Sequence, residues 1–505
     1  MTHDIVIVGA GHNGLAAGII LARAGRKVLI LEAQPEPGGA IRTAEATLPG
    51  FRHDLYATNL NAFAGSAFVG EFGAHLARHG FELVQSSKAF CSVFPDGAAV
   101  GVTTSLEETA AGLRRLSPHD ADAWLALAAR YDRIGPALIE VLRHPMPSRC
   151  ALALPLDGLR IATQSSRAFV ARHFEHPKIQ ALWAVWGMHL DFPPHIRGGA
   201  LYPFLQCMQT QAHGIRLGRG GARAMIDALT ALFQESGGEL RCAAPVARIA
   251  TERGAAVGVV VGRDYIAARS AVIANVTPTV VSRLVTERLT SRRYRYGPGA
   301  MMIHLALSDL PDWRDASARD FTYVHIAPSL AAMSRVYRQA MDGVLPDEPV
   351  LIVAQPTVVD PSRAPHGRHV LSIQVRMVPA TMDKERYADH VIDLVERYAP
   401  GLRQKILARH VISPADLERA NPNLVGGDSL AGSHHLAQQF VFRPFLGWSR
   451  YRTPIERLFI CGASTWPGAG VGAGSGWLLG HMLAKRRVPG EAQLAGKFVG
   501  SPAQG

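Results

Sequence analysis

The fold is decided by the stretch Asp4-Ile-Val-Ile-Val-Gly-Ala-Gly-His-Asn-Gly14. Its four apolar residues, Ile5 to Val8, predict a fully buried strand, and the glycines after them fit the pattern G-x-G-x-x-G at the start of a helix. Gly9 permits a tight turn, Gly11 lets the backbone approach a pyrophosphate, and Gly14 lets the helix lie close to the strand. Free N–H groups at the positive helix end then face the phosphates. The stretch therefore predicts a dinucleotide-binding turn.

The residues that follow support this interpretation. The pattern predicts a helix over 15–24 that stops at Gly25, and a second apolar strand, Val28–Leu31, that leads into Glu32. A carboxylate at this spacing accepts hydrogen bonds from ribose hydroxyls and disfavours a 2′-phosphate. The alternative, a glycine-rich turn in an ordinary strand-to-helix connection, does not require strand, helix, strand and acid in this order.

Length and composition bound the remaining possibilities. The 505 residues are 48% hydrophobic and 19% charged, which is typical of a folded chain with two domains of ordinary size. The net charge of +12 is compatible with an anionic partner, but the arginines are scattered and the longest basic cluster is only Arg292-Arg293-Tyr-Arg295. We therefore expect no nucleic-acid partner, and a weakly basic surface that favours peripheral contact with a membrane.

The five cysteines lie far apart, without a C-x-x-C pair or zinc spacing. This spacing argues against a disulfide-reductase mechanism, a metal site and a disulfide framework, and we expect reduced cysteines. The first strand begins near residue 4, which leaves no room for a signal peptide, and no apolar run reaches the roughly eighteen residues that span a bilayer. The expected location is the cytoplasm, with peripheral attachment to a membrane as an addition.

The pattern from 70 to 143 is mainly helical, and it predicts a helix over 120–142 that breaks at Gly135-Pro136. Another helix is expected over 165–190. Large apolar side chains concentrate at 181–192 and continue with Tyr202, Phe204 and Met208. These side chains either pack as a helical core or form a wall of an apolar substrate tunnel, and different residues can do each.

The chain then returns to the nucleotide-binding pattern with a helix over 222–235 and short strands that include 246–249, 256–261 and 271–274. From 278 to 424 it mixes expected strands (300–307, 350–354, 369–378) with expected helices (329–341, 384–398). This mixture predicts a second, mainly antiparallel α+β unit.

The last informative stretch is Leu458-Phe-Ile-Cys-Gly-Ala-Ser-Thr-Trp-Pro-Gly-Ala-Gly-Val471. A short buried strand runs into a glycine-rich turn and then into a helix that begins near Gly476. Backbone N–H groups at such a helix start stabilise a developing negative charge. The alternative is a glycine-rich linker.

The two terminal stretches, together with Gly38-Gly39, Arg42 and the closing Tyr451-Arg-Thr-Pro-Ile, resemble the phytoene-desaturase-like FAD oxidoreductases. The nearest branch is the pyridine nucleotide-disulfide oxidoreductase domain-containing protein 2 group, with the flavin-dependent carotene ketolases close by. The resemblance covers the whole chain and is weakest in the middle. Two departures concern the flavin ring: Trp466 stands where the family usually has His, and the glycine spacing over 470–476 differs.

The resemblance implies an α/β fold with a discontinuous, glutathione-reductase-like FAD-binding Rossmann domain and an inserted α+β substrate domain. The FAD domain would comprise residues 1–69, 214–285 and 425–490. The substrate domain would comprise a helical part, 70–213, and an α+β part, 286–424, and a flexible tail would follow over 491–505. The residues expected to bind FAD are Gly9, Gly11, Gly14, Glu32, Gly39, Arg42, Val246, Gly462, Gly468, Gly470 and Val471; Val246 is alternatively only a core residue.

The activity that the resemblance implies is hydride transfer to FAD from a long hydrophobic substrate, isoprenoid or carotenoid-like, which is thereby desaturated or oxidised. The chain has one dinucleotide fingerprint, so the expected electron acceptor is oxygen, a quinone or another protein. A flavin-dependent ketolase and a non-catalytic FAD-bearing scaffold are the alternatives. An amine oxidase would place a lysine near the flavin, whereas the seven lysines lie mostly in helical or tail contexts.

No residue is assigned to catalysis from the sequence. Asp428 and Arg443 fall in the closing region and either face the substrate or flavin or form ion pairs within the fold. His304 and the pair His434-His435 are expected to be structural histidines.

Overall fold

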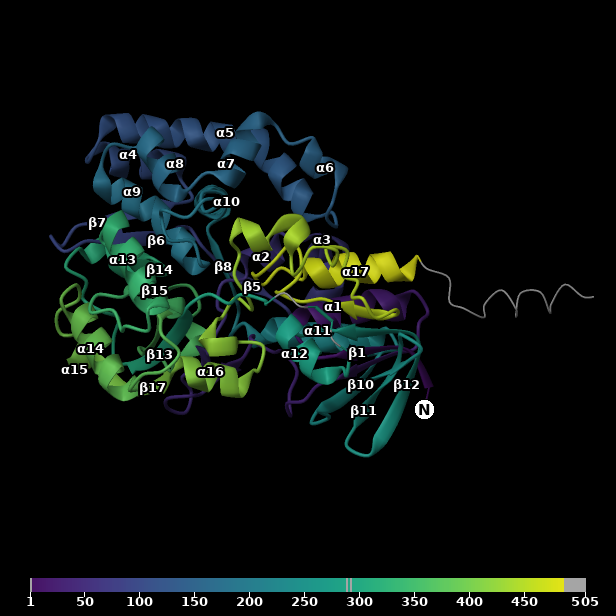
Figure 1. The fold of residues 1–505 in the computed structure, drawn as a ribbon. Coiled ribbons are helices and arrows are strands. Elements are labelled where there is room, and N and C mark those ends of the chain that lie inside the picture. The colour runs from purple at the N-terminus through teal and green to yellow at the C-terminus, as the bar shows by residue number, and fades with distance from the viewer. Residues whose placement is uncertain (1, 288, 291–292, 486–505) are drawn as a thin grey trace, which may run out of the picture.

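The computed structural model describes residues 2–287, 289–290 and 293–485. It contains two seven-stranded sheets: the first lies at the lower right of Figure 1, and the second lies at the left, beneath a lobe of helices. The predicted tail, 491–505, lies outside the described residues.

The first sheet has the strand order β10-β11-β12-β1-β2-β9, with β18 beside β12. Its strands are β1 (Thr2–Val8), β2 (Val28–Leu31), β9 (Glu239–Arg241), β10 (Val246–Glu252), β11 (Ala255–Val261), β12 (Asp264–Ala274) and β18 (Leu458–Ile460). The pairs β1–β2, β1–β12, β2–β9 and β12–β18 are parallel, whereas β10, β11 and β12 pair antiparallel. The sheet thus draws strands from three separate parts of the chain, as the sequence predicts.

Two helices pack on α1 (His12–Arg23) beside this sheet: α11 (Arg223–Glu235) and α17 (Gly474–Ala484). Small residues allow the close approach, since a Cβ added at Gly18 would lie 2.9 Å from Phe233, and one added at Gly480 would lie 3.1 Å from Ile20. A further helix, α12 (Pro278–Leu284), contacts β10.

The second sheet has the order β17-β13-β16-β15-β14-β6-β7. Its strands are β6 (Lys88–Val93), β7 (Ala99–Thr103), β13 (Gly299–Leu307), β14 (Tyr323–Ile326), β15 (Val350–Ala354), β16 (His369–Val378) and β17 (Ile406–Ile412). All neighbours pair antiparallel except β14 and β6. One face packs on α14 (Lys384–Glu396), and the other on α13 (Leu330–Met341) and the helical lobe. The expected mainly antiparallel α+β unit is therefore present.

The helical lobe forms the upper part of Figure 1. Its elements are α4 (Leu106–Arg114), α5 (Pro118–Leu142), α6 (Arg149–Leu152), α7 (Leu156–Thr163), α8 (Ser166–His173), α9 (Pro177–Ala184), the 3-10 helix η1 (Val185–His189) and α10 (Leu201–His213). The remaining elements are β3 (Thr43–Ala44), β4 (His53–Asp54), α2 (Asn61–Ala64), α3 (Ala67–Arg78), β5 (Leu83–Ser86), β8 (Ile215–Gly218), α15 (Leu402–Lys405), α16 (Pro414–Ala420) and the 3-10 turns η2 (Ala316–Asp320), η3 (Pro356–Val358), η4 (Pro361–Arg363), η5 (Val425–Gly427), η6 (Leu436–Gln438) and η7 (Phe440–Phe442).

The mainly helical pattern expected over 70–143 is confirmed by α3, α4 and α5, although the segment also contains three strands: β6 and β7 complete the second sheet, and β5 pairs with β8. Two other sequence-based expectations were wrong. Helix α5 runs unbroken through Pro136, where the buried neighbours Ile134 and Leu138 hold it against the lobe. The expected helix 165–190 is divided into α8, α9 and η1, because His176-Pro177 begins a new helix.

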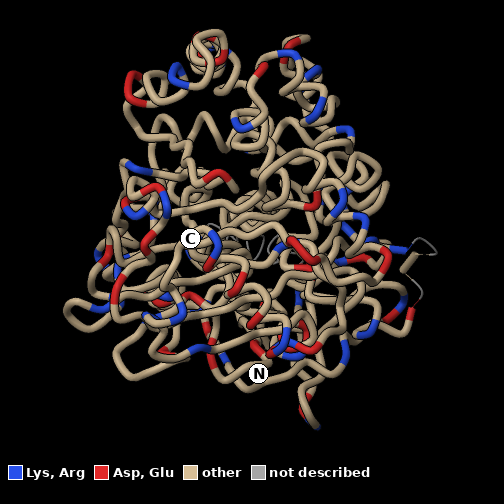
Figure 2. The backbone as a smooth tube through the Cα atoms, turned by 90° about the vertical axis from the view of Figure 1, so that its left-hand side faces the viewer, with Lys and Arg blue, Asp and Glu red and all other residues tan. Residues whose placement is uncertain are grey.

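Charged residues of both signs are interspersed in the view of Figure 2, without a continuous basic stripe. In the described part of the chain, no helix is long and apolar enough to span a bilayer. All five cysteines are free.

Candidate active site

The turn between β1 and α1 forms a cradle of bare backbone. Gly9 has φ +96°, and Gly11 at the N-cap of α1 has no side-chain cap. The first N–H groups of a helix have no partner inside it, so this uncapped end offers donors to an anion. A Cβ added at Gly14 would lie 2.4 Å from the carbonyl oxygen of Gly9. The expected role of Gly14 in close helix–strand packing is confirmed.

The second glycine pair lies against the first motif. The backbone of Gly38 donates to the Ala10 carbonyl at 3.1 Å, and a Cβ added at Gly39 would lie 3.6 Å from the Cα of Gly11. The two motifs, which are nearly thirty residues apart in sequence, thus share one surface.

Glu32 is 8% exposed and points back at the same turn. Its carboxylate accepts hydrogen bonds from Ala10 N at 2.8 Å and from Gln34 N at 2.9 Å. These bonds fix the carboxylate beside the cradle, where a ribose contact stays a prediction. Arg42 lies near Glu36 and Tyr56, and Val246 starts β10 two residues after Ala244, whose N–H donates to the Glu32 carbonyl.

The closing motif meets the opening motif through side chains that the sequence analysis did not assign. Ser475 Oγ accepts from Gly462 N at 2.8 Å and lies 3.0 Å from Asn13 Oδ1, which also accepts from Gly476 N at 3.1 Å. The first turns of α1 and α17 therefore adjoin, and both present their positive ends to the same region.

Asn275 ties the turn to β12 from the other side. Its Nδ2 donates to the carbonyls of Gly9 at 3.0 Å and Gly11 at 3.4 Å, and a Cβ added at Gly462 would lie 2.9 Å from its Oδ1. The available signal was a polar residue directly after the buried strand over 271–274, at the same sheet edge as the first turn.

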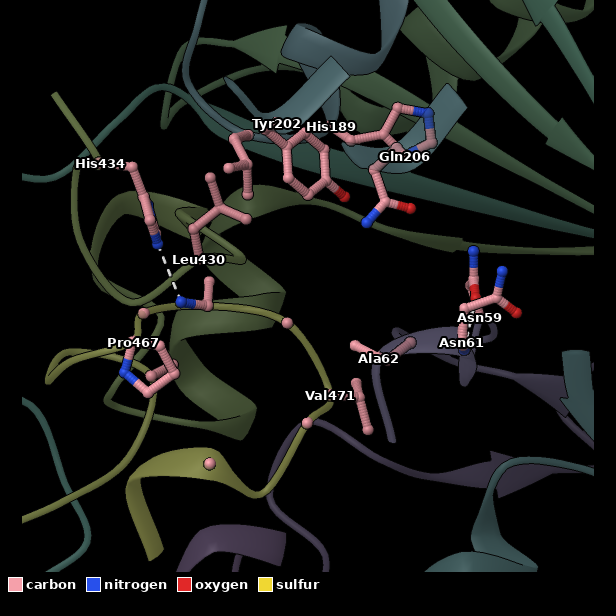
Figure 3. A pocket seen from close by; sticks show the side chains of 18 of the residues that line it. Asn59, Asn61, Ala62, His189, Tyr202, Gln206, Leu430, His434, Pro467 and Val471 are labelled. Atoms are coloured by element: carbon pink, nitrogen blue, oxygen red, sulfur yellow. Dashed lines mark hydrogen bonds between the residues drawn. The ribbon is translucent and has the colours of Figure 1, made fainter. Parts of the chain in front are cut away.

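A cavity of about 480 Å³ lies beside this region. The predicted residues Gly468, Gly470 and Val471 belong to its wall, whereas Gly462 lies outside its lining. Figure 3 shows Pro467 and Val471 on one side of the cavity and Tyr202 on the other. The apolar lining residues come from the helical lobe and from segments beside both sheets. They are Ile41, Phe68, Ile139, Leu142, Trp186, Leu190, Phe192, Leu201, Leu205, Met302, Leu417, Leu424, Leu430, Leu436, Phe440 and Trp466.

The apolar side chains at 181–208 divide between the two expected roles. Trp186, Phe192 and Tyr202 line the cavity. Trp183 and Phe204 pack in the fully buried core of the lobe.

All charged or titratable side chains that line the cavity are arginine, histidine or tyrosine. They are His12, Tyr56, Arg143, His189, Tyr202, Tyr323, Arg376 and His434. Among the described residues, no Asp, Glu, Lys or Cys lines this cavity. A substrate cation would find no counter-charge there.

His434 supports the glycine-rich turn. Ala469 N donates to its Nε2 at 2.8 Å (Figure 3), so the proton of the neutral ring lies on Nδ1. Burial, and then the nearby Arg443, lower the pKa of His434 well below its usual value. His434 N in turn donates to Asp191 Oδ1 at 2.9 Å. His434 therefore fixes the position of the glycine-rich turn at the cavity, because it connects Ala469 to Asp191.

The family model of the flavin containing amine oxidoreductases matches residues 14–474. The chain belongs to this family. A limonene dehydrogenase component of Castellaniella defragrans is 28% identical over 532 residues, covering 95% of this chain and 94% of that protein. Pyridine nucleotide-disulfide oxidoreductase domain-containing protein 2 of Rattus norvegicus is 25% identical, covering 95% and 93%. A phytoene dehydrogenase of Streptomyces griseus is 25% identical, covering 96% and 95%.

A solved oxidoreductase from Methanosarcina mazei has a TM-score of 0.62 at 16% identity, covering 95% of this chain and 100% of that one. The resemblance to phytoene-desaturase-like enzymes is confirmed by these matches, and the flavoenzyme is an FAD-dependent oxidoreductase.

The residues of this flavoenzyme fit its cofactor. The cradle of Gly9, Gly11 and Gly39 carries no side chain, and the uncapped start of α1 offers N–H groups of the kind that bind a pyrophosphate. These residues would hold the adenosine diphosphate part, and the start of α17 would face the flavin end.

The remaining sequence candidates have structural partners. Asp428 accepts from the N–H groups of Gly297, Leu430 and Gly432. His304 contacts Ser372 Oγ and the Leu55 carbonyl, as expected of a structural histidine.

Two further residues of the closing region are also fixed by carbonyl contacts. Arg443 donates to the carbonyls of Ser433 and Ala463, and no described carboxylate forms an ion pair with it, so the expectation of an ion pair was wrong for Arg443. Trp466, at the position where the family usually has His, is 1% exposed and donates from Nε1 to the His144 carbonyl at 2.9 Å.

Proposed function

We propose that this flavoenzyme desaturates or oxidises a long hydrophobic substrate of isoprenoid type. The observation that carries the proposal is the cavity of about 480 Å³, which is mostly apolar and has the glycine-rich turn over 468–472 in its wall. Concave apolar sites with few polar groups are typical of sites for greasy small molecules. The names of the relatives, a limonene dehydrogenase component and a phytoene dehydrogenase, support substrates built from isoprene units.

FAD, when bound, supplies the acceptor for a hydride that leaves one substrate carbon while a proton leaves its neighbour, so that a double bond forms. The protein orients the carbon chain and excludes water. Within the described residues, the lining supplies no carboxylate or lysine, which favours this chemistry over oxidation of a cationic amine. We also propose that the fold consists of a glutathione-reductase-like FAD domain with an inserted substrate domain.

The two electrons must then leave FAD. We place the acceptor among oxygen, a quinone and a second protein, because the sequence contains one dinucleotide fingerprint and so offers no second site for a nicotinamide cofactor.

Peripheral contact with a membrane would give such a substrate a route to the cavity. Leu152 is 88% exposed and Leu156 is 76% exposed, at the end of the helical lobe. Arg149 and Arg160 are exposed on the same short helices, and Leu142 and Ala162 nearby line the cavity. Exposed leucines with flanking arginines are suited to the surface of an anionic bilayer.

The decisive experiment mixes the FAD-loaded enzyme anaerobically with limonene, farnesol or phytoene and follows flavin absorption at about 450 nm. Bleaching by one of these substrates, with a product two hydrogens poorer, is the expected result. A flavin that none of them bleaches would refute the proposal, and a product formed only with both a reductant and oxygen would indicate an oxygenating enzyme instead.

The membrane contact is tested separately by co-sedimentation with anionic lipid vesicles. The double variant Leu152→Ser/Leu156→Ser should lose most of the vesicle-bound fraction, while its FAD content stays unchanged. The matched control Leu407→Ser, at a 45% exposed position on β17, should bind as the unaltered protein does. Equal sedimentation of all three proteins would contradict the contact.

A further inference from the structure

One wall of the cavity carries a buried cation. Gln374 and Arg376 alternate along β16, and their partners on β13, Met302 and Ala300, line the same cavity. Residues two apart on a strand share a face, so these four side chains form the floor. Arg376 is 6% exposed.

Among the described residues, the guanidinium of Arg376 is held only by neutral acceptors. Its Nε donates to the Met188 carbonyl at 3.0 Å, Nη2 to the His189 carbonyl at 2.9 Å, and Nη1 to Ser429 Oγ at 2.8 Å. An arginine has five N–H groups, so one on each terminal nitrogen stays without a partner among the described residues.

No carboxylate in the described part of the chain forms an ion pair with Arg376. Asp428 and Asp191 act on it only through longer-range attraction, and their oxygens accept hydrogen bonds from backbone N–H groups and from Ser433. Burial lowers the pKa of Arg376, which expresses the cost of keeping this charge away from water. A buried charge without a partner is costly, whereas one that meets an anionic ligand is not.

Two neutral polar groups accompany this charge. Tyr202 lies on α10 at the cavity, beside His189 and Gln206 (Figure 3). Its hydroxyl makes no hydrogen bond to another described residue, nor does the side-chain amide of Gln374. Burial raises the pKa of Tyr202, so the hydroxyl keeps its proton and remains a donor.

We propose that Arg376, with Tyr202 and Gln374, binds a carboxylate at one end of an otherwise apolar ligand. This inference rests on the proposed function and narrows its substrate class to isoprenoid acids. A planar carboxylate matches the two free N–H groups of the guanidinium. A phosphate or diphosphate carries more charge than one buried arginine offsets, and the other arginine of the lining, Arg143, is exposed.

The test compares two ligands of one carbon skeleton, farnesoic acid and farnesol, by calorimetric titration of the FAD-loaded enzyme. The acid should bind about ten- to a hundredfold more tightly than the alcohol, the range expected of charge-assisted hydrogen bonds. Arg376→Gln should remove this preference and leave the affinity for farnesol unchanged, and Arg376→Lys should retain part of it. The control Arg335→Gln, at a half-exposed position on α13, should preserve it in full.

Equal affinities of the unaltered enzyme for acid and alcohol would overturn the proposal, as would binding of neither. Since that comparison needs no variant, a variant that fails to fold does not weaken the test. An Arg376→Gln enzyme that retains FAD and still prefers the acid would also overturn it. Tight binding of the acid without bleaching of the flavin would support the carboxylate site and refute the proposed hydride transfer.

Discussion

Single residues decide whether the cofactor has space. At Gly11 the backbone is extended, with φ −69°, and the nearest atom to an added Cβ is Asn275 Nδ2 at 3.1 Å. At Gly14 an added Cβ would instead collide with backbone at 2.4 Å. Gly14 is therefore required by the fold, whereas Gly11 is predicted to be required by the bound FAD.

Gly11→Val should fold but bind FAD roughly tenfold or more weakly, because its side chain fills the space of the pyrophosphate and forfeits hydrogen bonds to it. Flavin absorbance per chain after gel filtration, with circular dichroism as the test of folding, measures this effect. The control Gly70→Ala, on α3 with no atom within 4 Å of the added Cβ, should retain all its FAD. Stoichiometric FAD in a folded Gly11→Val protein would contradict the assignment.

Asn275→Ala should destabilise the protein by about 1 kcal/mol, because it leaves two partly buried carbonyls without their donor. Asn275→Asp has the same shape but places a carboxylate beside the carbonyl oxygens of Gly9 and Gly11. It should therefore be the more harmful of the two for both stability and FAD affinity. Urea unfolding and titration with FAD measure both quantities, and an aspartate variant equal to the unaltered protein would refute this role of the amide.

At the scale of elements, one ion network joins the two halves of the molecule. Arg363, at the end of η4 and 0% exposed, donates to Asp54 on β4 at 2.6 Å, to Asp360 at 3.0 Å and to the Gly218 carbonyl at 2.8 Å. Asp54 also accepts from Ala222 N at the start of α11. The network thus connects η4 to β4, β8 and the start of α11.

Arg363→Met should cost about 3–5 kcal/mol, because it leaves two buried carboxylates without their counter-charge. Removal of the exposed pair between Arg114 and Asp122 by Arg114→Ala should cost less than about 1 kcal/mol. Urea unfolding at neutral pH compares the two variants. Similar losses in both would show that the network adds nothing beyond a surface ion pair.

At the scale of the whole molecule, buried neutral histidines make the fold sensitive to acid. Burial lowers the pKa of His53 to about 4, with help from His410 and Arg363, and burial lowers the pKa values of His304 and His325 to about 3. Burial raises the pKa of Asp428 to about 6, against the three N–H groups that favour its charged form.

Between about pH 6.5 and pH 4, these three histidines are therefore protonated in the unfolded chain but not in the folded chain. Asp428 has the opposite effect: below its raised pKa of about 6, the folded chain binds one proton that the unfolded chain does not bind. These four groups alone should make the free energy of unfolding fall as pH falls, by about 3 kcal/mol per pH unit near pH 5. Urea midpoints measured from pH 7.5 to pH 4.5 test this sign and slope. His304→Gln should reduce the slope by the contribution of about one bound proton. His366→Gln, at an exposed position, should leave the slope unchanged.

The sequence by itself determined the nucleotide-binding half, because its signals are local: the strand before Gly9, the glycine spacing and the acid at 32 all lie within one βαβ unit. The apolar runs over 300–307, 350–354 and 369–378 likewise predicted strands, which the structure confirms. Local patterns failed where partners are distant. The strands β6 and β7 exist because β14 pairs with β6, and α5 survives Pro136 because the lobe packs on it.

Only the tertiary structure decided which side chains connect the opening and closing glycine-rich motifs. Asn13, Asn275 and Ser475 come from three separate parts of the chain, and no spacing rule connects them. The same holds for Arg376, whose charge stands beside Tyr202 from a helix about 170 residues earlier. A cavity is a property of surfaces brought together by long-range packing, so its shape and charge follow from the complete fold and not from any one stretch.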